Sequence, residues 1–426
     1  MPIKLPFRIK KFNRYTDSEL ISMAFCLCVY SAVTTRYMNY TNLLLIVVVW
    51  KFILSGKKYR VAPLAFCWAL WIFIYPMVDA VIRGPGLSMF DLLCYLAPMS
   101  VFLAGNVKIE DFGKALLVFA KGFAWFQTAG IIMSMTVKGL YYSIAARVLG
   151  GIPHSICGFA TYTTMASYVI SVGMGAYLIE FAIIKWRTPR EKIICLVKIL
   201  ILFFGLTSTM KRTFLVSTVL AFMIVMMLNS MKSPKRVVVT FVVIVVAIVG
   251  VYSLSMYFYS IGSNNAFGRL GGTFVGVSEG EDVSNMRSTW AEFMAEWKKG
   301  HEIFGIGWEG FKIKINETSY AGAIPNGHNV YKQIDCEEGH VGLAIYVGLE
   351  FLALLIGIIN ILITIGKNTF AVEMAMWPTY IVIVYMIYCY TGNAIYESMI
   401  YLYFFGAIYI ISGINQKLLK LRSIET

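Results

Sequence analysis

A polar stretch at residues 260–342 interrupts an otherwise apolar chain and contains the runs RSTWAEFMAEWKKGHEIFGIGWEG (residues 287–310) and NGHNVYKQIDCEEGHVG (residues 326–342). Apolar runs of membrane-spanning length come before and after it. Lipid-exposed backbone inside a bilayer must be helical or form a closed barrel, so these runs indicate helices. The sequence therefore predicts a helical membrane protein with one large loop outside the bilayer.

The composition supports this interpretation. Of 426 residues, 58% are hydrophobic and 14% are charged, and the mean hydropathy is +0.70. Soluble domains are about 45–50% apolar and about 25% charged, so the excess apolar surface needs lipid. The net charge of +14 does not indicate nucleic acid, because the basic residues form small clusters between apolar runs. The eight cysteines fall mostly inside those runs, which argues against a disulfide framework.

The fold class is predicted to be an all-α polytopic membrane protein with about twelve transmembrane helices. The expected spans are 20–36, 41–55, 62–82, 88–105, 114–136, 157–183, 193–209, 212–230, 236–258, 341–364, 370–390 and 396–413. Residues 1–258 then hold helices 1–9, residues 259–340 form a periplasmic catalytic loop, and residues 341–426 hold helices 10–12 and a cytoplasmic tail.

The positions of lysine and arginine predict which side each loop faces. Clusters of these residues occur in alternate connections, at residues 4–14, 51–60, 185–192, 232–236 and 417–422. Cytoplasmic loops carry such an excess of positive charge. Both termini are therefore predicted to be cytoplasmic, and the polar stretch is predicted to face outward.

Inside the outer loop, a helix is predicted from Ser284 to about Lys298. Its apolar residues recur at helical spacing and include Met286, Trp290, Phe293, Met294 and Trp297. Ser284 is a suitable N-cap. Two interpretations remain: the apolar stripe packs inside the loop, or it lies on the membrane surface with Arg287 at headgroup depth.

Three arginines are candidates for binding an anion. Arg212 opens the predicted span 212–230 at its outer end, and Arg269 and Arg287 lie in the outer loop. A guanidinium group suits phosphate because its planar fork donates two parallel hydrogen bonds and stays charged. Each arginine taken singly is also compatible with a solvated or interfacial position. Their shared face favours an anionic ligand such as a lipid-linked phosphate.

His328 is the candidate for acid–base chemistry, because imidazole titrates near neutral pH. The alternative is a hydrogen-bonded loop residue. The chain lacks a phosphate-binding Gly-Lys-Ser/Thr loop, a dinucleotide fingerprint and a nucleophile elbow, and its histidines lack the i, i+4 spacing of a zinc helix. No metal and no cofactor are predicted. Glu350, inside the span 341–364, is expected either to face a partner in the bundle or to be protonated.

The order and spacing of these residues resemble the O-antigen ligase and polymerase superfamily. His328-Asn329 is followed after nine residues by Gly339 and then by Gly342, with Tyr331, Gln333 and Glu337 between them. The Arg287–Trp290 pair and the run His301 to Phe311 also resemble that family's loop. Arg212 and Arg269 stand where family members carry arginines, and Glu302 replaces a usual proline.

The resemblance implies a metal-independent glycosyltransferase of GT-C-like, multi-span architecture. From this resemblance it is expected to act on undecaprenyl-pyrophosphate-linked glycans at the outer face of the bacterial inner membrane. His328, Arg287 and Arg212 are expected to be catalytic. The expected substrate-binding residues are Arg269, Asn329, Tyr331, Glu337, Trp290 and His301. The arginines would hold the leaving pyrophosphate, and His328, oriented by Asn329 or Glu337, would take a proton from the acceptor hydroxyl.

The resemblance leaves two functions open, and a lipid-glycan transporter or flippase is a third alternative of another class. An O-antigen or surface-polysaccharide polymerase extends a glycan on its lipid carrier, whereas an O-antigen ligase moves the finished glycan to lipid A core. The Gly-Ile-Gly-Trp run at residues 305–308 and the long loop favour the polymerase. A flippase would need buried charges in its spans, and these look mostly uncharged. The expected partners are the lipid-linked oligosaccharide, membrane lipid and a chain-length regulator protein.

Overall fold

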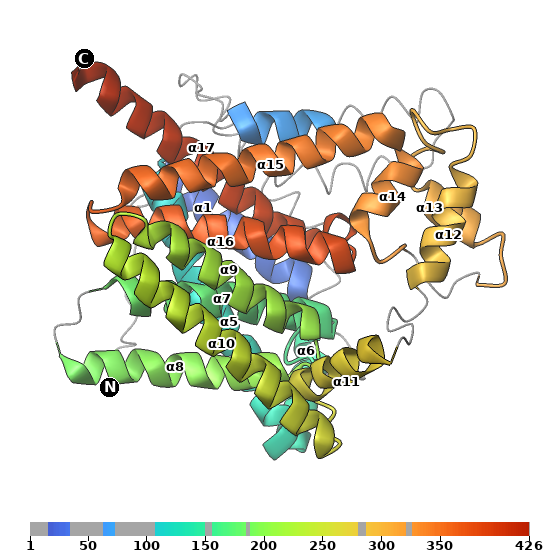
Figure 1. Ribbon diagram of the computed structural model, residues 1–426, viewed down its shortest axis with the longest axis horizontal. Coiled ribbons are helices and arrows are strands. Elements are labelled where there is room, and N and C mark those ends of the chain that lie inside the picture. Colours follow the sequence, from blue (N-terminus) through green and yellow to red (C-terminus); the bar gives the residue numbers. More distant parts are fainter. Residues whose placement is uncertain are drawn as a thin grey trace, which may run out of the picture.

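The computed structural model describes residues 16–34, 63–72, 107–149, 156–184, 188–279, 287–320 and 326–425, and these residues form helices without any strand. Figure 1 shows long helices lying side by side with shorter helices at one end. The all-α fold class is therefore confirmed. The helices up to the polar stretch are α1 (Asp17–Thr34), α5 (Ile109–Thr136), α6 (Lys138–Leu149), α7 (Thr163–Ile183), α8 (Pro189–Ser208), α9 (Arg212–Ser230) and α10 (Pro234–Ser260).

The remaining helices belong to the polar stretch and to the C-terminal part of the bundle. Those of the polar stretch are α11 (Ala266–Ser278), α12 (Arg287–Trp297), α13 (Gly310–Ile315) and α14 (Val330–Glu337). The C-terminal helices are α15 (Gly339–Thr364), α16 (Thr369–Thr391), the short 3-10 helix η2 (Ala394–Tyr396) and α17 (Ser398–Glu425). We call the end of the bundle where α9 and α15 begin and α16 ends the loop end.

Among the described residues, six helices are long and apolar enough to cross a membrane: α5, α7, α9, α10, α15 and α16. Shorter apolar helices occur at Ser18–Thr34, Pro63–Ile72 and Ile400–Ile414. Helix α8 coincides with the predicted span 193–209, but it carries charges at positions 190–192 and at Lys198. The predicted spans 41–55 and 88–105, and most of 62–82, lie outside the described residues, so the number twelve stays a prediction.

Helix α16 lies at the centre of the bundle, where it packs against α7, α9, α15 and α17. It is buried without interruption from residue 372 to residue 385. The Tyr380 hydroxyl donates to the carbonyl of Ser171 at 3.0 Å, and the Trp377 ring N–H donates to the carbonyl of Val172 at 3.1 Å. Buried aromatic side chains with satisfied polar atoms fix the position of a helix. The segment that follows α16 therefore begins at the end of a helix whose position in the bundle is fixed.

Helix α10 shows the opposite environment. It packs against α9 and α11, but Ser255 is its one buried residue. Its exposed apolar side chains include Val238, Val242, Val246 and Val249. A helix of this length with an uncovered apolar surface needs lipid around it, so α10 supports a membrane location for the bundle.

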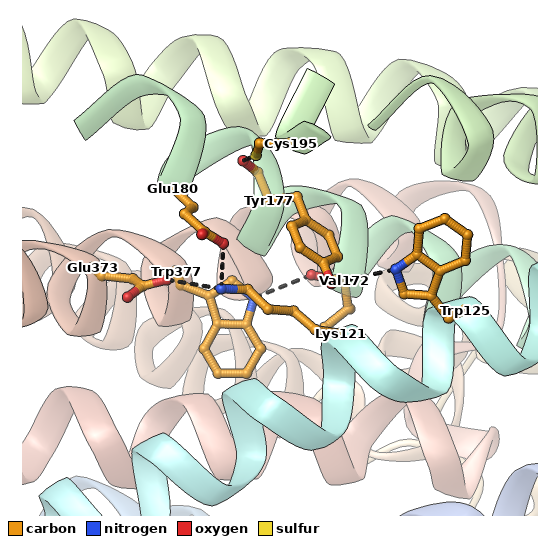
Figure 2. A network of polar contacts seen from close by, with 8 residues as sticks. All are labelled: Lys121, Trp125, Val172, Tyr177, Glu180, Cys195, Glu373 and Trp377. Carbon is orange, nitrogen blue, oxygen red and sulfur yellow. Dashed lines mark hydrogen bonds and ion pairs between the residues drawn. The ribbon is translucent and has the colours of Figure 1, made fainter. Parts of the chain in front are cut away.

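A charged network joins α5, α7 and α16 inside the bundle (Figure 2). Lys121 Nζ lies 2.8 Å from Glu180 Oε2 and 3.2 Å from Glu373 Oε1, and the three side chains are 18%, 23% and 11% exposed. The ammonium also lies 5.3 Å from the centre of the Tyr177 ring. The expectation that the spans are mostly uncharged fails at this point, because α5, α7 and α16 each contribute one charge and the three charges meet only in the folded bundle.

Replacing Lys121 with alanine leaves the carboxylates of Glu180 and Glu373 close together without their cation. Removing one partner of a buried ionic network costs about 3–5 kcal/mol, so Lys121→Ala is expected to lower the unfolding temperature of the purified protein in detergent. Lys114→Ala, at an exposed position of the same helix, is the control and should unfold like the wild type. Equal stability of the two variants would contradict a supporting role for this network.

Candidate functional site

The polar stretch folds into a small helical unit beside the loop end (Figure 1). Trp290 and Met294 of α12 are buried together with Phe311, Ile315 and Cys336 from α13 and α14. The apolar stripe of α12 therefore packs inside the loop, and the membrane-surface interpretation is wrong. Residues 281–286, which include the predicted N-cap, lie outside the described residues.

Trp290 is 1% exposed, and its ring meets that of Tyr320 edge to face, with the centroids 4.9 Å apart. A substrate therefore does not reach this ring in the structure. Trp290, expected from the resemblance to bind substrate, instead fills the interior of the loop. Its neighbour in the motif, Arg287, stands at the start of α12 and is half-buried.

The glycines of the motif join two parts of the polar stretch. Gly305 and Gly339 both have a φ of 67°, in the left-handed region that favours glycine. A Cβ on Gly305 would lie 2.3 Å from the carbonyl of Glu337, and one on Gly339 would lie 2.3 Å from the carbonyl oxygen of Ile303. Backbone hydrogen bonds of 2.8–3.2 Å connect residues 302–307 with residues 336–341. The spacing of the motif thus reflects two chain segments that cross at backbone contact.

The three predicted arginines come together at the loop end. Arg212, the first residue of α9, donates to the Thr273 hydroxyl on α11. Arg269, also on α11, donates to the carbonyl of Met210 at 3.1 Å. Arg287 and Arg269 both lie within electrostatic reach of Arg212. These guanidinium groups come from three helices that are separated in the chain, and helix packing brings them to one place.

Lys211 is a fourth cation at this position, and it is not among the site residues predicted from the sequence. Burial lowers the pKa of Lys211, the carboxylate of Glu397 raises it, and the charges of Arg269 and Arg287 lower it further. Glu397 itself accepts a hydrogen bond from Tyr388 at 3.0 Å. We call Lys211, Arg212, Arg269 and Arg287 the basic cluster. Repulsion between the positive charges in this cluster favours the binding of an anionic ligand.

His328 lies beside the basic cluster in the turn before α14. Burial lowers the pKa of its imidazole, and the positive charges of Arg287 and Lys211 lower it further. The residue has a φ of 54°, which is uncommon outside glycine. Asn393, in the turn after α16, holds it: the His328 backbone N–H donates to Oδ1 at 2.9 Å, and Nδ2 lies 3.2 Å from the imidazole Nδ1.

The residues expected to orient His328 have other contacts. Asn329 caps α14, because its side chain accepts from the backbone N–H of Lys332 at 3.0 Å. The fully buried Glu337 accepts from the backbone N–H of Phe311 at 3.2 Å and from the side chain of Gln333 at 3.0 Å. These bonds hold the loop in shape. Asn393 provides the contact with the ring of His328.

Two further predicted binding residues point elsewhere. The Tyr331 hydroxyl donates to Glu350 Oε2 on α15 at 2.8 Å, inside the bundle. Glu350 therefore has the partner that the sequence analysis expected as one alternative. His301 is exposed on the turn that leads to Gly305. The structure does not place Tyr331 or His301 in the basic cluster.

A cavity of about 1100 Å³ opens at the opposite end of the bundle. Its lining comes from the ends of α7 and α9, the start of α10 and the connection between α15 and α16. This cavity therefore lies away from the basic cluster, which is at the loop end.

The segment that contains the basic cluster is also similar to a known protein family. Residues 197–347 match the O-antigen ligase family. This match confirms the resemblance to the O-antigen ligase and polymerase superfamily, whose members are glycosyltransferase-like enzymes. It covers the chain from α8 to the first turns of α15, and so includes the four cations and His328 but not Asn393 or Glu397. No curated protein matches the chain.

Asn393 and Glu397 are not among the residues predicted from the sequence, although their position in the chain offers a signal. They lie between the predicted spans 370–390 and 396–413, or at the very start of the second. This short connection reaches the same side of the membrane as the polar stretch under the predicted topology. Polar residues in every connection on the outer side of the membrane, and not only those in the long loop, are therefore candidates for the functional site.

The crossing of the glycine segments predicts a difference between two alanine substitutions. Gly300 has a φ of 80° with open space around it, whereas Gly305 faces the backbone of Glu337. Gly300→Ala should cost about 1–2 kcal/mol from its left-handed backbone alone. Gly305→Ala should cost more, because the backbone must also move. Limited proteolysis of the loop measures this; equal protease resistance of the two variants would contradict the proposed crossing.

Proposed function

We propose that this protein is an O-antigen or related surface-polysaccharide polymerase. It transfers a growing glycan from undecaprenyl pyrophosphate to a sugar hydroxyl of the next lipid-linked repeat unit, at the outer face of the bacterial inner membrane. The observation that carries this proposal is the basic cluster beside His328, inside the segment that matches the family. Both termini are then cytoplasmic, and the polar stretch is periplasmic.

The charge of the basic cluster suits the leaving group of this reaction. Undecaprenyl pyrophosphate departs with increasing negative charge on its phosphate oxygens, and preorganised donors near that charge accelerate transfer. The guanidinium groups of Arg212, Arg269 and Arg287 donate bidentate hydrogen bonds, and Lys211 adds a point charge. Four cations at one place therefore provide the stabilisation that a divalent metal supplies in other transferases.

The surroundings of the cluster suit a substrate with a long lipid tail. Arg269 lies on α11, and α11 packs against α10, whose apolar surface is uncovered. A polyprenyl chain lying along α10 keeps its tail in lipid while its pyrophosphate reaches the basic cluster. Binding of the tail in this way contributes to positioning of the reacting group.

The O-antigen ligase is the second candidate, and the name of the matching family favours it. A ligase uses the same donor but transfers the glycan to lipid A core, so the basic cluster serves both reactions. The third candidate is a lipid-glycan flippase. The buried network of Lys121, Glu180 and Glu373 is a feature that transporters use, but its charges pair with one another and lie away from the loop end.

The fork geometry of Arg287 gives a test of the pyrophosphate site. Arg287→Lys keeps a positive charge but loses the bidentate donor, so transfer of glycan from purified lipid-linked oligosaccharide should fall about 100-fold or more. Arg287→Ala and His328→Ala should be inactive while still inserting into the membrane. Arg190→Lys, exposed at the start of α8, is the control. Full activity of Arg287→Lys would remove Arg287 from the proposed site.

Deletion of the gene separates the three candidates. Loss of a polymerase should leave surface polysaccharide with a single repeat unit on lipid A core. Loss of a ligase should instead leave long chains on the carrier lipid and none on lipid A core. Glycan transfer by purified protein in detergent, where no membrane gradient exists, would exclude a flippase as the explanation.

A further inference from the structure

The contacts between His328 and Asn393 determine where the imidazole proton sits. The backbone N–H of His328 can only donate, so the Asn393 atom 2.9 Å away must be the carbonyl oxygen Oδ1. The amide nitrogen Nδ2 then faces the ring, 3.2 Å from Nδ1. An amide NH₂ group can only donate, so Nδ1 must accept. The neutral imidazole therefore carries its proton on Nε2.

This tautomer conflicts with a base at position 328. A base needs a lone pair directed at the acceptor hydroxyl. In His328 the lone pair lies on Nδ1 and is occupied by Asn393, which is 7% exposed. Nε2 carries hydrogen and offers a donor, and among the described residues no hydrogen bond involves it. The nearby cations Arg287 and Lys211 mark the region where the pyrophosphate would bind.

We propose that Asn393 is a positioning residue that fixes His328 as the Nε2–H tautomer, so that His328 donates a hydrogen bond to the departing pyrophosphate. This inference rests on the proposed glycosyl transfer. It assigns His328 to stabilisation of the leaving group together with the basic cluster. Asn393 acts through His328 and does not itself touch the substrate.

The transfer step balances without a base at His328. The bond between the anomeric carbon and the phosphate oxygen breaks, and its electron pair stays on the pyrophosphate. The acceptor hydroxyl oxygen forms the new bond to the anomeric carbon, and its proton passes to water. The charge that develops on the phosphate oxygen is met by Nε2–H of His328 and by the guanidinium groups. A transition state with oxocarbenium character does not require early deprotonation of the acceptor.

The tautomer can be measured without any substrate. The chain contains four histidines, so protein labelled with ¹⁵N-histidine gives few imidazole signals, and the one missing from His328→Gln belongs to residue 328. The wild type should show hydrogen on Nε2 and a bare Nδ1. Asn393→Asp should reverse this, because a carboxylate accepts from Nδ1–H. A bare Nε2 in the wild type would overturn the inference, whatever reaction the protein catalyses.

The activity of Asn393→Asp depends on pH in opposite directions for the two roles of His328. The carboxylate keeps the bond to the His328 backbone and raises the pKa of the imidazole against the lowering effects of Arg287 and Lys211. Above that raised pKa the imidazole is neutral and its proton sits on Nδ1, where the carboxylate accepts it. Nε2 then has no hydrogen and cannot donate to the pyrophosphate. Below it, the imidazolium has hydrogen on both nitrogens and the donor returns.

We therefore expect Asn393→Asp to be about 100-fold less active than the wild type at pH 8 and within about tenfold of it at pH 5.5. A base at His328 predicts the reverse, with activity kept at pH 8 and lost at pH 5.5, and that result would overturn the inference. The ratio of variant to wild type at each pH removes effects common to both proteins.

A second variant distinguishes a hydrogen-bond donor from a general base at position 328 and leaves Asn393 unchanged. Glutamine offers an amide N–H near the position of Nε2 but cannot accept a proton. His328→Gln should therefore retain activity within about tenfold of the wild type, whereas His328→Ala should lose about 100-fold or more. Equal loss in both variants would contradict the donor role. Asn368→Asp, which caps the opposite end of α16, is the control and should change neither the NMR signals nor the pH profile.

Discussion

Repulsion between four positively charged side chains must be offset at the loop end, and the rest of the site depends on how this is done. The four residues come from the start of α9, from α11 and from α12, and the charges of Arg269 and Arg287 act on both Lys211 and Arg212. Such a group is unfavourable unless surrounding packing holds it in place or an anion neutralises it. The hydrogen bonds of Arg212 to Thr273 and of Arg269 to the carbonyl of Met210 fix two of the guanidinium groups. The concentration of positive charge at this site therefore favours a negatively charged ligand, such as the pyrophosphate of the proposed reaction.

Two independently anchored parts of the protein meet at His328. One is α16, which is buried along most of its length and carries Asn393 just beyond its end. The other is the polar stretch, whose own core contains Trp290 and Phe311 and whose segments cross at Gly305 and Gly339. Precise geometry at a site comes from supports of this kind, because a loop alone does not hold a side chain to within a fraction of an ångström.

The sequence predicts the three arginines of the basic cluster but not Lys211 or the surroundings of the cluster. Arg212, Arg269 and Arg287 were found because arginine at a membrane surface is conspicuous and the motif order resembles a known family. Trp290 was assigned to substrate and lies in the loop core instead. Asn393 was missed because asparagine in a short turn has no distinctive pattern. Its importance arises from contact with a residue 65 positions away.

The sequence alone determined the helical membrane fold, the single large polar stretch and the similarity of its central segment to the O-antigen ligase family. These follow from hydropathy and motif spacing, which are properties of neighbouring residues. Only the tertiary structure decided which charges meet, as for Lys121 and Glu373, which lie 252 positions apart. It also decided which nitrogen of His328 carries the proton. Charge pairing and tautomers depend on atoms brought together by helix packing, and no local pattern encodes that geometry.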